Sequence, residues 1–245
     1  MITILIGLFL LGGLLTLTGA MKRTSGVQGN LDQLHDSERL AMTIMTDVIQ
    51  SAGFFPLTPA NVANASSTAA AQLPATGAWL AGQSIYGTHT GTTAAPVDTI
   101  SVRYLTGGAD GVLNCTGATS TVAATWINTF QIDGSGNLQC QLTTGTAAAA
   151  AVTLVNGVNT SGTNVGGVQN LGVLYGVQTN TSSGTTSVDT YLTADQVTSG
   201  KYWGNVISVK ITLYFANPLS SQPGQQNAPQ MKIARVIDLM NKAGP

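Results

Sequence analysis

The first twenty residues form an apolar stretch that contains no charged residue and no proline, and Lys22 and Arg23 follow it. About twenty consecutive apolar residues are what an α-helix needs to cross the hydrocarbon core of a bilayer. Glycines lower helix stability, yet they let helices approach closely in an apolar medium. The stretch contains four of them, Gly7, Gly12, Gly13 and Gly19. Residues 1–20 are therefore expected to lie in lipid or against other apolar helices.

Three interpretations of this segment stay open. A signal peptide normally starts with a basic region, and no basic residue precedes this segment. A plain membrane anchor fits the length, and so does a stem that first lies in a membrane and later packs against identical stems. The positive-inside rule applied to Lys22 and Arg23 would leave the remainder in the cytoplasm. The two cysteines and the Thr/Ser/Gly-rich composition of that remainder favour export, which is the interpretation adopted here.

From Asn30 onwards, apolar residues recur at three- and four-residue spacings, which predicts a helix with a single apolar stripe. The stripe consists of Leu31, Leu34, Ala41, Met45, Val48 and Ala52, with Leu40, Ile44 and Ile49 beside it. Gly53 and Pro56 predict the end of the helix. Gly26 and Gly29 are expected to loosen its middle.

The predicted organisation is a helical stem over residues 1–53 and a globular head over residues 54–245, with 1–20 as the membrane or filament-core segment. The stripe is expected to pack the second half of the stem against the chain's own head. The residues assigned to this stem-to-head packing are Leu34, Ala41, Met45, Val48 and Ala52.

The head shows the period-two alternation of β-strands. Strands are predicted at 99–105, 129–133, 137–142, 171–177 and 205–215, and a strand or a short helix at 231–240. Gly134-Ser135-Gly136 predicts a hairpin turn between the second and third of these. Residues 57–96 are expected to form a long surface loop, held by Trp79, Leu80, Ile85 and Tyr86. The fold class is α+β, with a long N-terminal hydrophobic and amphipathic α-helix packed on an antiparallel β-sheet.

The composition indicates a surface with few charges. Charged residues make up 8% of the chain, about a third of the usual share, and the net charge is −1. No nucleic-acid partner is expected, because the basic residues of the head are few. They are Arg103, Lys201, Lys210, Lys232, Arg235 and Lys242. So few charges suit a secreted protein or a subunit packed among copies of itself.

The two cysteines, Cys115 and Cys140, both lie in the head. A disulfide between them would close a loop of about 25 residues and would stabilise the fold by roughly 3–4 kcal/mol in the chain-entropy model. The alternative is a pair of buried free thiols.

The chain offers little material for catalysis. His35 and His89 are the only histidines, and no hydrolase, phosphate-binding or metalloprotease motif occurs. We therefore expect no enzyme activity, no cofactor and no metal site. Residues 133–137 superficially resemble a calcium loop, but the later bidentate glutamate is missing and a hairpin turn is the favoured interpretation.

Several stretches occur in the order in which a known family has them. They are 6–15 (IGLFLLGGLL), 34–41 (LHDSERLA), 47–54 (DVIQSAGF), 98–104 (DTISVRY), 113–115 (LNC), 138–140 (LQC), 171–177 (LGVLYGV), 191–195 (YLTAD) and 203–211 (WGNVISVKI). In these the chain resembles the PilW family of type IV pilus minor pilins. No single stretch is chemically specific, and the resemblance rests on their collinear order along nearly the whole chain.

The resemblance implies a type IV pilin fold and a structural subunit that lies in the inner membrane before assembly and in an extracellular pilus afterwards. Its partners would be copies of itself or other pilins, the inner membrane and the pilus assembly machinery. The residues expected in the filament core are Ile4, Leu5, Leu8, Leu11, Gly12, Gly13 and Leu15. Alternatives are a tip adhesin or DNA-uptake pilin and a type II secretion pseudopilin.

One departure from the family concerns the N-terminus. Pilins begin with a basic leader, a glycine, an N-methylated phenylalanine and a nearby glutamate, and none of these precedes Ile2. Met1 resembles an internal position a few residues past that glutamate. No residue of this sequence is therefore assigned as the processing site.

Overall fold

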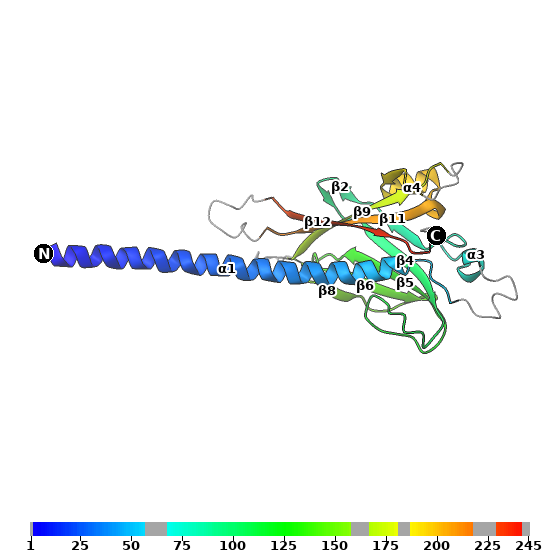
Figure 1. Cartoon of the computed structure of the whole chain (residues 1–245), viewed down its shortest axis with the longest axis horizontal. Coiled ribbons are helices and arrows are strands. Elements are labelled where there is room, and N and C mark those ends of the chain that lie inside the picture. Colours follow the sequence, from blue (N-terminus) through cyan, green and yellow to red (C-terminus); the bar gives the residue numbers. More distant parts are fainter. Residues whose placement is uncertain (1, 57–67, 158–166, 181–186, 218–228, 242–245) are drawn as a thin grey trace.

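A single long helix, α1 (Ile2–Gln50), projects from a β-rich head (Figure 1). The computed structural model describes residues 2–56, 68–157, 167–180, 187–217 and 229–241. The helix runs through Gly26 and Gly29 without a break, so the expected loosening of its middle is wrong. At 1.5 Å per residue its 49 residues span roughly 75 Å.

The first sheet of the head is antiparallel, with the strand order β1-β4-β5-β6-β7 and with β8 paired to β6. Its strands are β1 (Ile85–Thr88), β4 (Thr99–Thr106), β5 (Ala124–Ile132), β6 (Leu138–Thr144), β7 (Ala147–Ala148) and β8 (Val152–Val155). The predicted hairpin joins β5 to β6. It confirms the turn at 134–136, where Gly136 has a φ of 81°.

The second sheet is also antiparallel, with the order β10-β9-β11-β12. Its strands are β9 (Val168–Val177), β10 (Thr190–Leu192), β11 (Val206–Phe215) and β12 (Met231–Asp238). A two-stranded ribbon, β2 (Gly91–Thr92) with β3 (Ala95–Pro96), lies beside it. The short helices are α3 (Ala69–Gln72), α4 (Ala194–Gly200) and the 3₁₀ turn η2 (Trp203–Asn205).

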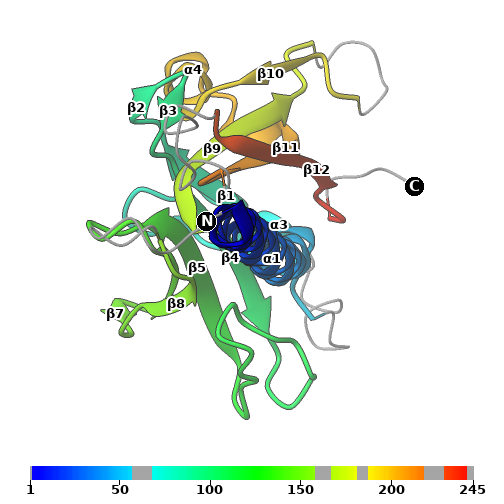
Figure 2. The same ribbon diagram turned by 90° about the vertical axis from the view of Figure 1, so that its left-hand side faces the viewer.

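The C-terminal half of α1 lies between the two sheets, as the end-on view in Figure 2 shows. The inward-facing side chains of β4, β5, β9 and β11 form one buried cluster with the helix stripe. On β11, for example, Val209, Ile211 and Leu213 are fully buried. The helix therefore completes the core of the head instead of lying on its surface.

These findings confirm the α+β class and the strands predicted between residues 99 and 215. Of the strand and the short helix considered for residues 231–240, the structure has a strand over 231–238, which pairs along β11 and buries Ile237. Two expectations are wrong. The head contains two principal sheets and not one. The segment before Pro96 contains β1 to β3 as well as turns, although residues 57–67 lie outside the described residues.

Candidate functional site: an exposed apolar stem anchored in the head

The N-terminal half of α1 carries an apolar surface that the other described residues do not cover. Ten large apolar side chains are described between Ile4 and Met21, and each is 55–83% exposed, with Phe9 the most exposed. Full burial of such a side chain contributes about 1.5–3 kcal/mol. Because these side chains are on average about two-thirds exposed, covering all ten would stabilise the bound state by roughly 10–20 kcal/mol. In the described part of the chain, this helix is long and apolar enough to cross a membrane.

The residues expected in the filament core all lie on this bare segment. Ile4, Leu8, Leu11 and Leu15 are exposed by 61–72%. A Cβ atom added at Gly12 or Gly13 would meet no atom within 4 Å. The side chain of Leu5 lies outside the described residues. The described residues bring no partner to these positions, so their role in packing stays a prediction.

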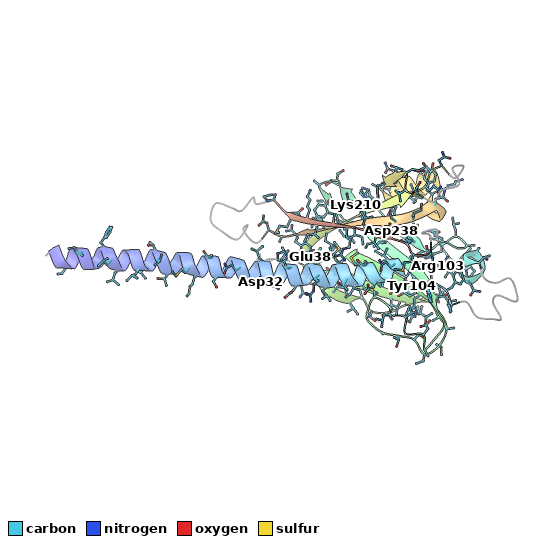
Figure 3. All side chains as sticks on the ribbon, viewed as in Figure 1. Asp32, Glu38, Arg103, Tyr104, Lys210 and Asp238 are labelled. Atoms are coloured by element: carbon cyan, nitrogen blue, oxygen red, sulfur yellow. A yellow bond between two sulfur atoms is a disulfide. The ribbon has the colours of Figure 1, made fainter. Side chains whose placement is uncertain are left out.

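The anchored half of α1 begins at Leu34, near the point where Asp32 and Glu38 mark the edge of the head (Figure 3). All five residues assigned to stem-to-head packing are buried, with exposed fractions of 0–3%. They are Leu34, Ala41, Met45, Val48 and Ala52. The structure adds Met42 and Ile49 to this set, both at most 1% exposed. Leu40, which the pattern placed beside the stripe, is 51% exposed.

Backbone hydrogen bonds fix the point where the stem enters the head. Gly53 has a φ of 74°, in the left-handed region that favours glycine, and this turns the chain after the helix. Its N–H donates to the carbonyl of Arg103 at 2.9 Å, and the N–H of Leu105 donates to the carbonyl of Phe54 at 2.8 Å. Asn241 donates from Nδ2 to the carbonyl of Ala52 at 3.1 Å. The end of the stem is thus joined directly to β4.

Arg103 is buried at this junction and holds the loop before β1. Its guanidinium donates to the carbonyls of Leu73 (3.3 Å), Pro74 (2.8 Å), Leu80 (2.9 Å) and Gln83 (2.9 Å). Removal from water lowers the pKa of Arg103. Arg103 is one of the few basic residues of the head, and its burial removes it from the surface.

A row of aromatic rings extends from Arg103 across the head. Its guanidinium lies 4.9 Å from the ring centroid of Trp79. Ring contacts then link Trp79 to Tyr86 (6.0 Å), Tyr86 to Trp203 (5.2 Å) and Trp203 to Tyr175 (4.9 Å). The row ties the first sheet to β9 and η2. Leu80, also expected to hold this loop, is instead 61% exposed.

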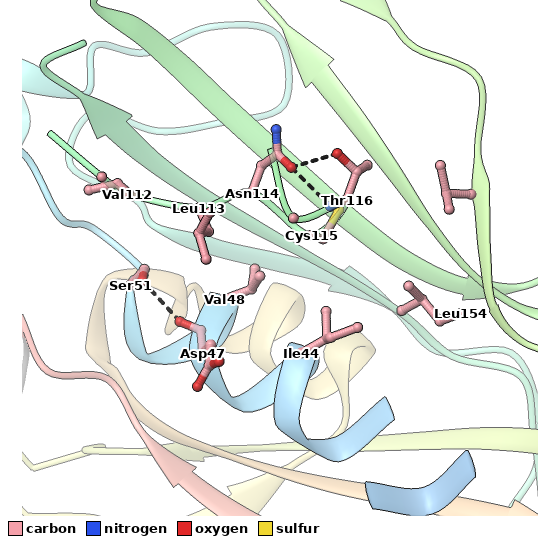
Figure 4. A pocket seen from close by; sticks show the side chains of 13 residues that line it. Ile44, Asp47, Val48, Ser51, Val112, Leu113, Asn114, Cys115, Thr116 and Leu154 are labelled. Carbon is pink, nitrogen blue, oxygen red and sulfur yellow. Dashed lines mark hydrogen bonds between the residues drawn. The ribbon is translucent and has the colours of Figure 1, made fainter. Parts of the chain in front are cut away.

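The predicted disulfide between Cys115 and Cys140 is confirmed, with the two Cα atoms 6.2 Å apart. It fastens the loop between β4 and β5 to β6. A groove of about 460 Å³ lies between this loop and α1, as Figure 4 shows. Ile44 and Val48 of the helix and Leu154 of β8 provide apolar parts of its wall. The stem is therefore flanked by an open apolar groove where it enters the head.

Comparison with known proteins bears on the head. Residues 128–237 match the family model PilW, described as Type IV Pilus-assembly protein W. These residues form a PilW domain. A search of curated proteins and a search of solved structures each returned no match. The resemblance stated above is thus confirmed over a little under half of the chain, and the stretches upstream of residue 128 lie outside the match.

The PilW domain runs from the second half of β5 to the end of β12, and it contains Cys140 but not Cys115. Its first hairpin carries the loop that resembled a calcium site. Asp133 there accepts hydrogen bonds from Ser135 N, Asn137 N, Asn137 Nδ2 and Gln139 Nε2, at 2.6–2.9 Å. These bonds, with the Asn137 side chain first, lower the pKa of Asp133. The carboxylate serves the turn, as the hairpin interpretation expected.

The described residues contain no group of three or more His, Cys, Asp or Glu side chains that could hold a metal ion. A bare apolar rod presents surface for lipid or other helices, and a disulfide-braced head containing the PilW domain holds that rod at a fixed angle.

Proposed function

We propose that this chain is a structural subunit of a type IV pilus-like extracellular filament, assembled through packing of its N-terminal stem against the stems of neighbouring subunits. The observation that carries the proposal is the run of ten exposed apolar side chains between Ile4 and Met21. Water is a poor solvent for this surface. The inner membrane would cover it before assembly, and sister stems would cover it afterwards.

The match of the PilW domain to a pilus-assembly family supports the pilus context. The partners proposed on this basis are copies of this chain or other pilins, together with the pilus assembly machinery. The division into a stem over 1–53 and a head over 54–245 belongs to the same proposal. Because six residues of α1, and Ala52 directly after it, are buried in the head core, a head would be carried rigidly on each packed stem.

The surface charge of the head gives no support to DNA uptake. Arg103 is buried, and Lys242 lies outside the described residues. Lys201, Lys232 and Arg235 are exposed and Lys210 is half-buried. Lys201 follows α4, and Arg235 lies on the opposite face of β12 from Lys232 and donates to Thr46 of α1. A DNA-binding groove needs several cations that follow the phosphate backbone.

A substitution that leaves the monomer unchanged tests stem packing. Gly13→Leu adds bulk where nothing lies within 4 Å, keeps the segment apolar and replaces a poor helix former with a good one. Membrane insertion of the full chain should therefore be kept, while close approach of a neighbouring stem is blocked. We expect a normal amount of the variant in the membrane fraction and at least a tenfold loss from filaments sheared from cells, measured by quantitative mass spectrometry.

The matched control is Leu15→Met, which nearly conserves volume on the same bare segment and should enter filaments at the native level. Gly13→Leu protein that enters filaments as well as the native chain would contradict close stem packing. Native filaments that contain no copy of this chain would overturn the proposal. Copies counted per unit length in imaged filaments distinguish a main subunit from a rare one.

A further inference from the structure

A small cavity lies on the outer face of the second sheet, under the β2–β3 ribbon. Its volume is about 140 Å³, which is room for several water molecules or for one sugar ring. Gly172 and Leu174 of β9 and Thr212 and Tyr214 of β11 line one side. These positions alternate with the core-facing residues of the same strands, so their side chains point away from α1.

The ribbon side of the cavity carries an oriented histidine. The Asp98 side chain is almost completely buried, and its Oδ2 accepts a hydrogen bond from the N–H of Val173 at 2.8 Å. Its Oδ1 accepts from Nδ1 of His89 at 2.7 Å and from the N–H of Thr90 at 3.3 Å. This bond fixes the imidazole ring and leaves Nε2 of His89 without a hydrogen-bond partner among the described residues.

The sheet side offers unpaired hydroxyls beside an aromatic ring. The ring of Tyr214 is largely buried, and its hydroxyl lines the cavity without a hydrogen-bond partner in the described part of the chain, as does that of the half-buried Thr212. Burial first, and the charge of Asp98 second, raise the pKa of Tyr214, so the phenol remains a donor at neutral pH. Gly172 makes the room, because a Cβ there would lie 3.0 Å from Cγ of Pro96 and 3.4 Å from Cε2 of Tyr214.

We propose that this cavity binds one neutral sugar ring, such as the terminal residue of a surface glycan. His89, Thr212 and Tyr214 present polar atoms to the cavity that no described protein group occupies, and a polyhydroxylated ligand could hydrogen-bond with all three together. The rings of Tyr214 and Pro96 offer apolar surface to the C–H face of a sugar.

The charges around the cavity favour a neutral ligand over an anionic one. The carboxylate of Asp98 lines the cavity and would repel an anion. Lys232 lies 5.1 Å from the ring centroid of Tyr214, but neither it nor Lys210 of β11 is among the lining residues.

The cavity would stay open in an assembly built on stem packing. Figures 1 and 2 place β2 and β3 on the far side of β9 and β11 from α1. Packing along α1 alone would therefore not cover this face. Only this point rests on the proposed function, because sugar binding itself needs the head alone.

Saturation-transfer NMR on the full chain in a detergent without sugar groups tests the proposal. The probes are the methyl glycosides of glucose, galactose, mannose and N-acetylglucosamine, with methyl sialoside as the anionic probe. We expect transfer to at least one neutral glycoside. Tyr214→Phe and Thr212→Val each remove one hydroxyl and keep the shape, so each should weaken that binding by about fivefold.

The matched control is Tyr191→Phe, because Tyr191 lies on the same sheet face, its hydroxyl pairs with Ser208 at 3.3 Å, and it does not line the cavity. This variant should bind as the native chain does. Melting temperatures within a few degrees of native establish that the variants are folded. No transfer to any neutral glycoside, transfer to the sialoside alone, or full binding by both cavity variants would each overturn the proposal. Filament incorporation of the same variants should stay native, so the two proposals fail separately.

Discussion

Reduction of the Cys115–Cys140 disulfide should lower the free energy of unfolding of the head by about 3.5 kcal/mol. The bridge joins residues 25 apart in the sequence. In the chain-entropy model, closing such a loop removes roughly 12 cal/mol/K from the unfolded chain, which corresponds to about 3.5 kcal/mol at 25 °C. The effect is expected to come mainly from the unfolded state.

The folded head should keep its shape without the bridge, because hydrogen bonds hold the same loop independently. The hydroxyl of Tyr104 donates to the carbonyl of Leu113 at 2.6 Å. Oδ1 of Asn128 accepts from the N–H of Cys115 at 2.9 Å. The carboxylate of Asp110 accepts from the N–H of Gly107 at 2.7 Å. Near-ultraviolet circular dichroism should therefore be nearly identical for the oxidised and reduced proteins at low denaturant.

Urea unfolding of the full chain in detergent, followed by tryptophan fluorescence with and without reductant, measures the change. The variant with Cys115→Ala and Cys140→Ala should resemble the reduced protein and should not respond to reductant. Equal unfolding free energies for the oxidised and reduced proteins, with reduction verified by thiol titration, would refute the loop-entropy reasoning. A reduced protein that loses its near-ultraviolet spectrum would instead show that the bridge shapes the native loop.

Three further outcomes are expected. Met45→Ala removes a fully buried side chain between the sheets and should lower the free energy of chemical unfolding by about 2–5 kcal/mol. The same change at the exposed Leu40 should lower it by less than about 1 kcal/mol, and equal losses would contradict the packing assignment. Arg103→Leu leaves four backbone carbonyls without their donor, and it should lower the free energy of unfolding by about 3 kcal/mol. Amide exchange in residues 73–83 should become faster, and unchanged exchange would count against this role. Asp133, whose pKa is lowered by hydrogen bonds led by that of the Asn137 side chain, stabilises the fold above the unfolded pKa near 3.8, and this contribution is lost as pH falls through the lower folded pKa. The difference in unfolding free energy between native protein and Asp133→Asn should therefore shrink below about pH 4, and a constant difference would refute it.

The stem and its stripe could be predicted because helix periodicity is a local signal. Leu34, Met45 and Val48 share one face through their spacing alone, and their burial needs only a head to cover them. The extent of the bare segment followed in the same way from the absence of charge in residues 1–20.

The division of the head into two sheets could not be predicted, because pairing depends on contacts between distant segments. The register of β9 with β11 brings Val173 opposite Ile211, and nothing in either strand specifies the other. Strand β1 was missed because its four residues include a glycine and lie in a polar stretch.

Arg103 shows the same limit at one position. It lies between Val102 and Tyr104, where alternation places it on the face opposite the core and predicts exposure. The loop that covers this face comes from residues 73–83, and its sequence does not indicate that its backbone carbonyls would converge on a distant arginine. The sugar cavity likewise depends on the ribbon carrying His89 crossing over β9 and β11, which are distant in sequence.

The two backbone hydrogen bonds at the end of α1 have a mechanical consequence. Gly53 and Phe54 bond to β4 on the side where β1 pairs, so a tensile load pulled along the stem reaches an interior strand of the first sheet. Parting β4 from β5 requires several hydrogen bonds to break together, whereas an attachment to a sheet edge would peel one bond at a time. A head fastened in this way would resist extraction from a strained fibre better than its thermodynamic stability alone suggests.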